Sequence, residues 1–573
     1  MSVKENIIKI LKEIVPDFLD STLTIPPNSL MGDYAIACFV YAKQSKKSPL
    51  DFAKELKEKI DALTNKNIIV KAEISGPYVN IFINREKFIH DVISDIQRQK
   101  DKFGSEDKKD KTIVIDYSGP NVAKNMGIHN LRSTIIGQSL YNSYKFLGYK
   151  TVGVNHLGDW GTQFGKLIWA SEKWSNPNEL QEKGILFLNE LYVRYHKLCD
   201  DLKLEGKEKE VEQMEEESRL WFKKIEDNNE RAIMWWKIFI DISLLEYNSI
   251  YKRLDISFDE VKGESYYIPY IDSALKTLEE HKLTTIDDGA LVVKFDEKEK
   301  MPPCLLKKSD GATLYGTRDI AAGMYRLKTY NPTKVLYLTD IAQGFHFKQW
   351  FKVMELLDAK NKEIFVHVDF GRLSFPDSDM STRKGNIVPL KEVLDKSSNK
   401  ALSIIQEKSP DLKNKEDIAE IVGIGAIIFG DLSNDRLNNI VFEWDKVLDF
   451  QGETAPYIQY TYARIKSILR KEDAKIEKKF DSKFLTEKSE YDLVKKLSDF
   501  NSVLNQVILN NKPSILCRYL IDLCQMFNKY YDNVTILKAY DDVKNARLIF
   551  ILQITTVIKN GMHILGINVP ERM

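Results

Sequence analysis

The sequence predicts a multidomain α/β protein in which a parallel-sheet domain lies between an N-terminal α+β domain and a C-terminal all-α domain. Apolar runs of strand length alternate with helical periodicity between residues 109 and 400, which is typical of a parallel sheet with helical crossovers. Strand-like segments precede this region, and helical periodicity alone follows it. We therefore expect domains over residues 1–108, 109–400 and 401–573, with a helical insertion at about residues 170–260.

The bulk composition narrows the class of protein without indicating a partner. Lys plus Arg equals Asp plus Glu at 84 each, so net charge says nothing about nucleic-acid binding. The five cysteines form no C-x-x-C pair, which argues against a zinc knuckle or disulfide framework and predicts buried thiols. The N-terminus lacks the features of a secretory signal, and the longest strongly apolar run, residues 548–552, is too short to span a bilayer. The expected location is the cytoplasm.

The N-terminal region contains one capped helix followed by strands. Ser48 and Pro49 are typical of a helix start, and apolar residues recur at helical spacing up to Ile60. Residues 68–74 and 78–83 are predicted as strands separated by a Gly-Pro turn. The charged residues 100–111 are expected to form a linker.

The central region begins with an apolar strand at residues 112–118, and an amphipathic helix follows it. Further strands are predicted at residues 151–154, 335–338 and 365–368. The Glu- and Lys-rich residues 205–231 are expected to form a solvated helix within the insertion. After about residue 400 strand signals vanish and only helices are expected.

A candidate phosphate site lies where the first central strand meets its helix, in the segment DYSGPNVAKNMGIHNLRSTIIG. A parallel sheet places this loop at the ligand crevice, and a helix N-terminus offers unpaired N–H groups and a positive dipole to phosphates. The polar residues that cluster there are Lys124, His129, Asn130 and Arg132. On the residues alone, a structural turn explains the loop equally well.

The same segment resembles the arginyl-tRNA synthetase family, whose members carry a sequence like S-S-P-N-x-A-K-P-x-H-x-G-H-L-R-S-T at this place. The matching residues are Ser118, Pro120, Asn121, Ala123, Lys124, Leu131, Arg132, Ser133 and Thr134. Residues 155–168, NHLGDWGTQFGKLI, also resemble the family closely. The resemblance implies a class I, Rossmann-like catalytic domain that activates L-arginine with Mg²⁺ and ATP and transfers it to the 3′ end of tRNA-Arg. It also implies a monomer in which the tRNA end helps to complete the active site.

The family's H-x-G-H signature is altered in this chain, where it reads Gly127, Ile128, His129 and Asn130. Because the family's histidines donate to ATP phosphates, the resemblance assigns ATP binding to Gly127, His129 and Asn130, and catalysis to the last two. Asn130 retains a side-chain donor. His129 replaces a glycine against which adenine lies, so its Cβ requires a shift of the adenine or of the local backbone.

A second segment, GRLSFPDSDMSTRKGNIVPL, resembles the family's mobile K-M-S-K-S loop; taken alone, it would also fit a solvated basic loop. The residues that match are Met380, Ser381, Thr382, Arg383 and Lys384. Asp379 stands where many relatives have lysine, and an acid repels a triphosphate. Relatives without that lysine carry one at the position of Lys124. The resemblance therefore assigns ATP binding to Lys124, Met380, Ser381 and Arg383, with Lys124 and Arg383 stabilising phosphate charge as catalytic residues.

Arginine recognition calls for a planar carboxylate together with neutral acceptors. Asp116 ends the first central strand, and DGATLYGTRDIAA places Tyr315 and Asp319 one helical turn apart. Taken alone, Asp319 fits an ordinary surface carboxylate. His346, in the matching Q-x-x-H-F piece, is assigned to ATP. The residues that the resemblance assigns to arginine are Asp116, Ser118, Asn121, Tyr315, Asp319 and Gln343.

The C-terminal segments DFQGETAPYIQYTYARIKSILRK and GINVPERM resemble the family's anticodon-binding module. Helical spacing turns the Ile458 and Tyr462 side chains toward a core and leaves Tyr457 and Arg464 available to RNA. The residues assigned to tRNA binding are Tyr457, Arg464 and Met573. The N-terminal domain, with its Gly-Asp-Tyr-Ala motif at residues 32–35, resembles the family's added domain that grips the tRNA elbow.

Two alternatives stay open at this point. A degenerate homologue that binds tRNA without making an adenylate would explain Asp379, Gly127 and His129. A class I synthetase for another amino acid is opposed by the arginine-type N-terminal domain and by the acids Asp116 and Asp319.

Overall fold

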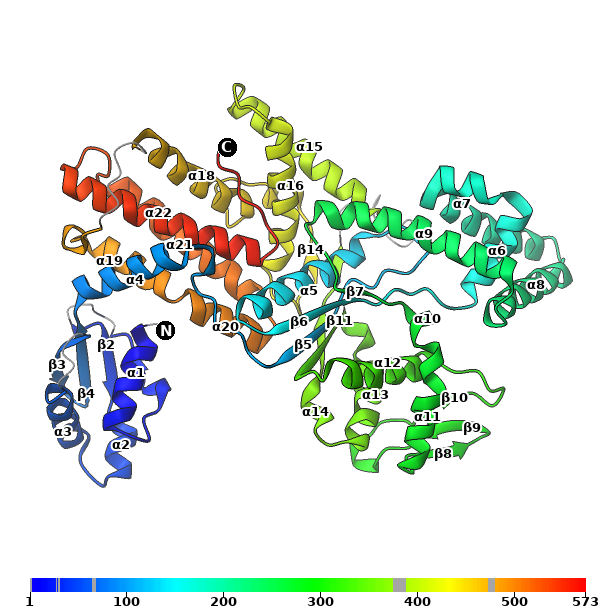
Figure 1. Ribbon diagram of the computed structural model, residues 1–573, viewed down its shortest axis with the longest axis horizontal. Coiled ribbons are helices and arrows are strands. Elements are labelled where there is room, and N and C mark those ends of the chain that lie inside the picture. The colour runs from blue at the N-terminus through cyan, green and yellow to red at the C-terminus, as the bar shows by residue number, and fades with distance from the viewer. Residues whose placement is uncertain (1–2, 27, 29–30, 64–67, 375–387, 473–479) are drawn as a thin grey trace.

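The computed structural model describes residues 3–26, 28, 31–63, 68–374, 388–472 and 480–573. Figure 1 shows an elongated molecule with the N-terminal domain at one end, beneath the C-terminal helices, and the helices α6 to α9 at the other end. The central sheet lies between these ends. None of the described helices is long and apolar enough to cross a membrane.

The N-terminal domain is an antiparallel sheet with helices packed on it, as predicted. The sheet has the strand order β1-β2-β4-β3. Ser48 caps α3 by accepting the Asp51 N–H at 3.1 Å, which confirms the predicted helix start. The elements are α1 (Val3–Ile14), β1 (Leu23–Thr24), β2 (Tyr34–Ala37), α2 (Phe39–Gln44), α3 (Pro49–Asp61), β3 (Ile69–Ser75), β4 (Tyr78–Ile83) and α4 (Arg85–Gln99).

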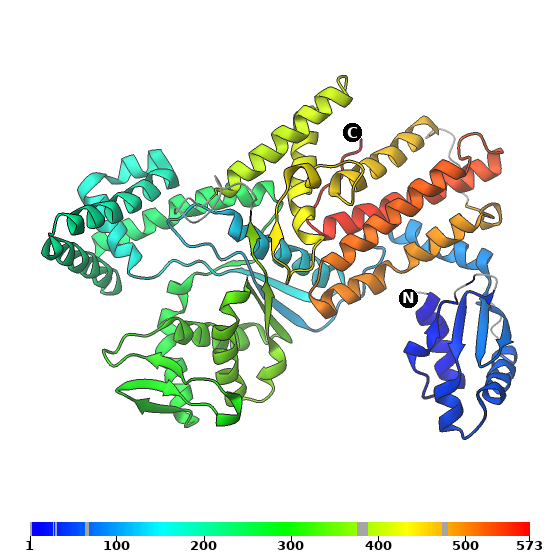
Figure 2. The ribbon, with the colours of Figure 1, turned by 180° about the vertical axis from the view of Figure 1, so that it is seen from behind.

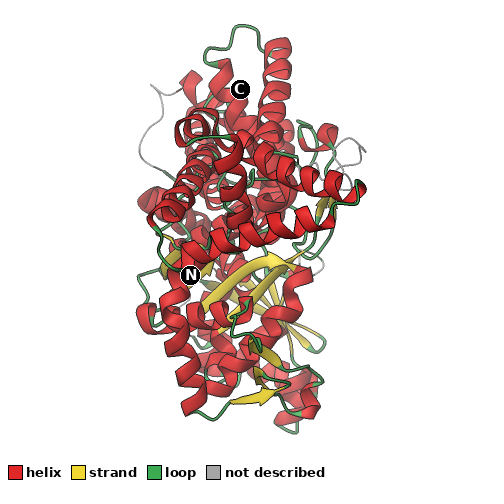
Figure 3. Ribbon diagram, turned by 90° about the vertical axis from the view of Figure 1, so that its right-hand side faces the viewer, coloured by secondary structure: helices red, strands yellow, loops and turns green. Residues whose placement is uncertain are grey.

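The central sheet is parallel throughout, with the strand order β12-β11-β5-β6-β7. The structure confirms the prediction of a parallel sheet and of four of its strands, β5, β6, β11 and β12; β7 was not predicted. The strands are β5 (Thr112–Asp116), β6 (Lys150–Asn155), β7 (Glu260–Val261), β11 (Lys334–Asp340) and β12 (Phe365–Phe370). Ile113 and Ile115 face one core, and Val114 faces a second core on the other side of the sheet. Seen from the side in Figure 3, helices cover both faces of the strands.

Three groups of helices surround this sheet. The helix α5 (Ile128–Phe146) follows β5 and is buried on almost every side. The insertion consists of α6 (Gln163–Trp174), α7 (Pro177–Leu204), α8 (Glu208–Glu226) and α9 (Glu230–Arg253). The second face carries α10 (Glu264–Tyr267), α11 (Ile271–Glu280), β8 (Thr284–Asp287), β9 (Ala290–Val293), β10 (Cys304–Lys307), α12 (Tyr315–Tyr330), α13 (Gly344–Leu357) and α14 (Asn361–Ile364).

The C-terminal region is helical, and the view from behind shows its long helices lying side by side (Figure 2). The expectation that strands are absent after residue 400 is wrong in one place, because β13 (Leu373–Ser374) pairs with β14 (Ile440–Val441). Two-residue strands carry too few residues for a periodic signal. The helices are α15 (Leu390–Lys408), α16 (Lys415–Leu432), α17 (Trp444–Val447), α18 (Ala455–Glu472), α19 (Lys488–Ser498), α20 (Phe500–Asn510), α21 (Ser514–Asn533) and α22 (Asp541–Ile564).

The segment at residues 100–111 connects the first two domains, as expected of a linker, but it is packed against the C-terminal helices. Phe103 is buried, and its ring stacks on Phe500 of α20 with a centroid distance of 6.4 Å. Asn501 donates to the carbonyl of Gly104 at 2.9 Å. The five cysteines are buried free thiols, which confirms that prediction.

Candidate active site

The loop between β5 and α5 is held in one shape by its backbone angles and by the insertion helix α9. Ser118 and Ala123 adopt positive φ angles of 73° and 66°. Ser243 of α9 accepts the Ala123 N–H at 2.9 Å, and Tyr247 of α9 donates to the carbonyl of Lys124 at 2.7 Å. The insertion therefore fixes the segment that carries Lys124.

The start of α5 offers hydrogen-bond donors and positive charge. The N–H of the cap residue Gly127 donates to Asn130 Oδ1 at 3.0 Å, so Asn130 closes the first turn with its oxygen and keeps its Nδ2 donor available. The His129 side chain reaches solvent, but its ring lies close to the surrounding protein. The partial loss of hydration, and next the charge of Lys124, lower the pKa of His129. These groups at the positive end of a helix suit an anion.

The core of the second signature lies outside the described residues, which have a gap at residues 375–387. Its predicted site residues, Met380, Ser381 and Arg383, fall in that gap, as do the altered Asp379 and the matching Thr382 and Lys384. The described residues that follow it run alongside the start of α5. The Ile128 N–H donates to the carbonyl of Val388 at 3.1 Å, and the Leu390 N–H donates to the carbonyl of Met126 at 2.8 Å. Residues 388–390 therefore lie directly beside the first signature.

Arg132 does not belong to the phosphate site, and the expectation that it clusters there is wrong. Its side chain is 1% exposed, and its Nε lies 2.9 Å from Asp431 Oδ2 of α16. Its Nη1 donates to the carbonyls of Gly371 and Asn438 at 2.6 and 2.9 Å. Burial raises the pKa of Asp431 to about 6, although the Arg132 charge opposes this shift. Arg132 therefore ties α5 to the C-terminal helices.

A cavity of about 450 Å³ lies at the carboxyl ends of β5 and β11, where a parallel sheet places its ligand crevice. All the residues predicted to bind arginine line this cavity, and His346 joins them. They are Asp116, Ser118, Asn121, Tyr315, Asp319, Gln343 and His346. Asp116 and Tyr337 are paired in register on adjacent strands, which explains how distant segments meet here.

Asn121 is positioned by the glycine of the Gly-Asp-Trp-Gly segment. Its Oδ1 lies where a Cβ on Gly158 would stand, only 2.2 Å away, so any larger residue would displace the amide. The Gly158 N–H donates to the carbonyl of Pro120 at 3.1 Å. Gly158 therefore allows the two loops to approach closely.

Each acid that lines the cavity has a basic neighbour. Asp116 Oδ2 lies 2.7 Å from Nη2 of the fully buried Arg326. Asp319 Oδ2 lies 2.6 Å from His346 Nε2, which is charged only when protonated. The charge of Asp116 is thus already balanced inside the protein, whereas that of Asp319 is not permanently balanced.

The sequence reasoning missed the third acid, Glu264, and its partner Arg318. Glu264 starts α10 directly after β7 and lines the cavity. Its Oε2 lies 3.0 Å from Arg318 Nε. Burial raises the pKa of Glu264 to about 7, and the Arg318 charge opposes this shift. The available signal was an acid at the first position of a helix that follows a strand, but β7 has only two residues and is not recognisable in the sequence.

The C-terminal module presents a second, basic groove of about 610 Å³. Its lining residues are Leu412, Tyr460, Ala463, Arg464, Ser467, Arg470, Lys471, Arg572 and Met573. Arg464 and Met573 were predicted to meet here. Tyr457 lies outside these residues, half-buried, and accepts a hydrogen bond from Asn528 at 2.8 Å. Ile458 and Tyr462 face the core as predicted.

Comparison with known protein families divides the chain into three parts. The models that match are the class I (R) tRNA synthetase catalytic domain over residues 92–444, the DALR anticodon-binding domain over residues 458–573 and the arginyl-tRNA synthetase N-terminal domain over residues 1–83. The chain is 40% identical over 575 residues to the arginine–tRNA ligase of Halothermothrix orenii, covering 100% of this chain and 99% of the relative. It is 42% identical over 579 residues to the arginine–tRNA ligase of Clostridium perfringens, covering 100% of both.

Solved structures share the fold over the whole chain. The arginyl-tRNA synthetase of Plasmodium falciparum superposes with a TM-score of 0.81 at 24% identity, and the Thermus thermophilus arginyl-tRNA synthetase with 0.79 at 22%. Both comparisons cover 100% of this chain and 99% of the other. At this level of identity the likeness concerns the fold alone.

Proposed function

The chain belongs to the arginyl-tRNA synthetases, and we propose that it activates L-arginine with ATP and transfers the arginyl group to the 3′ end of tRNA-Arg. AMP and diphosphate are the other products. At the active site, this proposal is supported by one cavity that all the predicted arginine-binding residues line. Positioning and charge stabilisation supply the catalysis.

Asp319 is the best candidate to receive the guanidinium. Among the cavity's three carboxylates, Asp116 and Glu264 each face a permanent arginine charge, and Asp116 also lies 3.9 Å from His156 Nδ1, whereas the partner of Asp319 is His346. One negative charge is therefore available, which matches one guanidinium. Tyr315 lies one turn before Asp319 and is 63% exposed, so its ring can flank the bound side chain.

We expect Asp319→Asn to raise KM for arginine by about 100-fold, or ~2.7 kcal/mol, because the substitution removes the charge from a desolvated ion pair. Steady-state aminoacylation with varied arginine measures the change. Asp310→Asn, a surface carboxylate that caps the preceding turn, is the matched control and should leave KM unchanged. Equal arginine KM values for the two variants would show that Asp319 does not bind the guanidinium.

The phosphate end of ATP is proposed to lie at the start of α5. The Gly127 and Ile128 N–H groups already have partners, so the donors proposed for phosphate are the side chains of Lys124, His129 and Asn130. Gly127 caps the helix that carries the last two. Magnesium is proposed to arrive bound to the triphosphate, since Mg²⁺ prefers phosphate oxygens and water. In-line attack of the arginine carboxylate on the α-phosphate would then expel diphosphate.

The basic C-terminal groove supports anticodon binding. Arg464, Arg470 and Arg572 supply phosphate charge, and the half-exposed ring of Tyr460 offers a stacking face. Tyr457 and Met573 are proposed to add further contacts. We also propose that the enzyme is monomeric and lies in the cytoplasm.

The deciding experiment combines the purified protein with radiolabelled arginine, ATP, Mg²⁺ and a tRNA-Arg transcript. Arginyl-tRNA is expected to accumulate, whereas labelled lysine should give none because its ammonium cannot bind bidentately. Absence of charging together with intact tRNA binding would favour the binding-only alternative that Asp379 and His129 suggest.

A further inference from the structure

A buried carboxylate joins the N-terminal domain to the C-terminal helices. The Asp33 side chain is 3% exposed. Its Oδ2 accepts the Ile83 N–H at 3.0 Å, inside the domain. Its Oδ1 accepts two hydrogen bonds. One comes from Arg85 Nη2 at the start of α4, at 2.8 Å, and the other from the Tyr491 hydroxyl of α19, at 3.1 Å. We call Asp33, Arg85 and Tyr491 the Asp33 junction.

Helix α4 is anchored to the C-terminal helices rather than to the N-terminal sheet. Phe88 of α4 packs edge-on against Tyr491 with a centroid distance of 5.8 Å. Beyond the end of α4, Asn560 of α22 donates to the carbonyl of Lys100 at 3.1 Å. The covalent connection between sheet and α4 is the short passage through Asn84, which caps α4 by accepting the Lys87 N–H at 3.0 Å. The Asn84 N–H also donates to the carbonyl of Ile68 at 2.9 Å, so both this passage and the Asp33 junction tie the sheet to α4.

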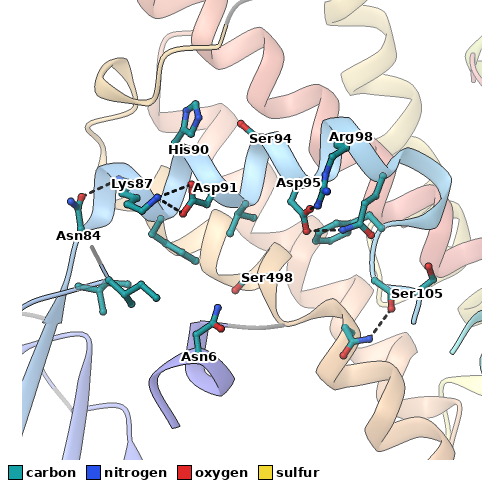
Figure 4. Close-up of a pocket in the computed structure, with 18 of the residues that line it drawn as sticks. Asn6, Asn84, Lys87, His90, Asp91, Ser94, Asp95, Arg98, Ser105 and Ser498 are labelled. Atoms are coloured by element: carbon teal, nitrogen blue, oxygen red, sulfur yellow. Dashed lines mark hydrogen bonds and ion pairs between the residues drawn. The ribbon is translucent and has the colours of Figure 1, made fainter. Parts of the chain in front are cut away.

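An open groove, not a packed interface, lies beside the junction. It has a volume of about 920 Å³ and runs between the N-terminal domain, α4 and the end of α19. Figure 4 shows two of its lining residues, Asn6 of α1 and Ser498 of α19, beneath α4. Two further contacts with α19 lie near the junction: Lys495 Nζ donates to the Asp33 carbonyl at 3.4 Å and lies 4.5 Å from the ring centroid of Tyr34. Among the described residues, these polar contacts with α19 therefore gather around Asp33.

We propose that Asp33 is a positioning residue. It fixes the orientation of the N-terminal domain relative to the C-terminal helices, so that this orientation need not change when tRNA binds. This inference rests on the proposed function, in which the N-terminal domain holds the tRNA elbow. A domain that is already oriented avoids an entropic cost when tRNA binds. The junction should therefore affect KM for tRNA and leave kcat at saturating tRNA unchanged.

Tyr491→Phe tests the junction with little risk to folding, because it removes the hydroxyl and keeps the ring against Phe88. KM for tRNA-Arg is expected to rise about fivefold, the effect of one hydrogen bond to a carboxylate. Tyr530→Phe is the matched control, because that hydroxyl also donates to a buried carboxylate, Glu490 at 3.1 Å, but within the C-terminal module. It should keep the wild-type KM for tRNA.

Two further readouts separate positioning from general stability. Small-angle X-ray scattering of the free Tyr491→Phe variant should give a larger radius of gyration than wild type, a result that requires no activity. The double variant Asp33→Ala/Tyr491→Phe should have the same KM for tRNA as Asp33→Ala alone, since alanine already removes the acceptor of the Tyr491 hydroxyl. Unchanged scattering, or widened scattering with a wild-type KM, would overturn the inference. Failure of the wild-type protein to charge tRNA would instead overturn the proposed function.

Discussion

Lys124→Ala is expected to lower kcat for arginylation on the order of 1000-fold, about 4 kcal/mol of transition-state stabilisation. The physical reason is the charge arrangement around the triphosphate. The second signature carries Asp379 where a lysine would neutralise phosphate, and Lys124 stands in the rigid loop before α5. Its charge lowers the pKa of the neighbouring His129, which supports an orientation toward the start of the helix.

A rescue experiment tests whether a positive charge in the second signature can replace that of Lys124. Lys145→Ala, at the opposite end of α5, is the control and should keep the wild-type rate. Introducing Asp379→Lys into the Lys124→Ala protein should restore part of kcat, because it returns a positive charge to the other signature. A near wild-type rate for Lys124→Ala would refute the assignment of Lys124 as a catalytic residue. Arg383 would then be left as the residue that stabilises the phosphate charge.

The elements that the sequence predicted well are those whose physical signal is local. The strands β5, β6, β11 and β12 are apolar runs bounded by turn residues, and the structure has all of them. Once these strands are parallel, their carboxyl ends must meet. Asp116, Tyr315 and Asp319, from segments about 200 residues apart, therefore came together as expected.

Side-chain partners from distant segments could not be predicted in this way. The helix α5 is buried on nearly every side, polar residues included, so nothing in its periodicity distinguishes a buried Arg132 from a phosphate ligand. The carboxylate of Asp33 meets the Tyr491 hydroxyl across a separation of 458 residues. Pairing of Glu264 with Arg318 likewise depends on how α10 packs against α12. Such contacts follow from tertiary packing, which overrides local preference.

Arg132→Met is expected to destabilise the fold by about 3–5 kcal/mol, because it leaves the buried carboxylate of Asp431 without its charge partner. The carbonyls of Gly371 and Asn438 lose their donor in the same variant. Urea unfolding, followed by circular dichroism and tryptophan fluorescence, measures the shift of the transition that reports on α5 and α16. Arg518→Met is the control, since Arg518 is 58% exposed in its ion pairs and its loss should leave the unfolding transition nearly unchanged.

The double variant Arg132→Met/Asp431→Leu distinguishes charge pairing from packing at this position. Removing both charges eliminates the uncompensated carboxylate, so part of the lost stability should return, whereas the two carbonyls still lack a donor. Full recovery would mean that the hydrogen bonds to Gly371 and Asn438 contribute nothing. No recovery would mean that the cost comes from those bonds alone. Partial recovery is the result expected if Arg132 acts both as the charge partner of α16 and as the donor that holds the chain before the second signature against α5.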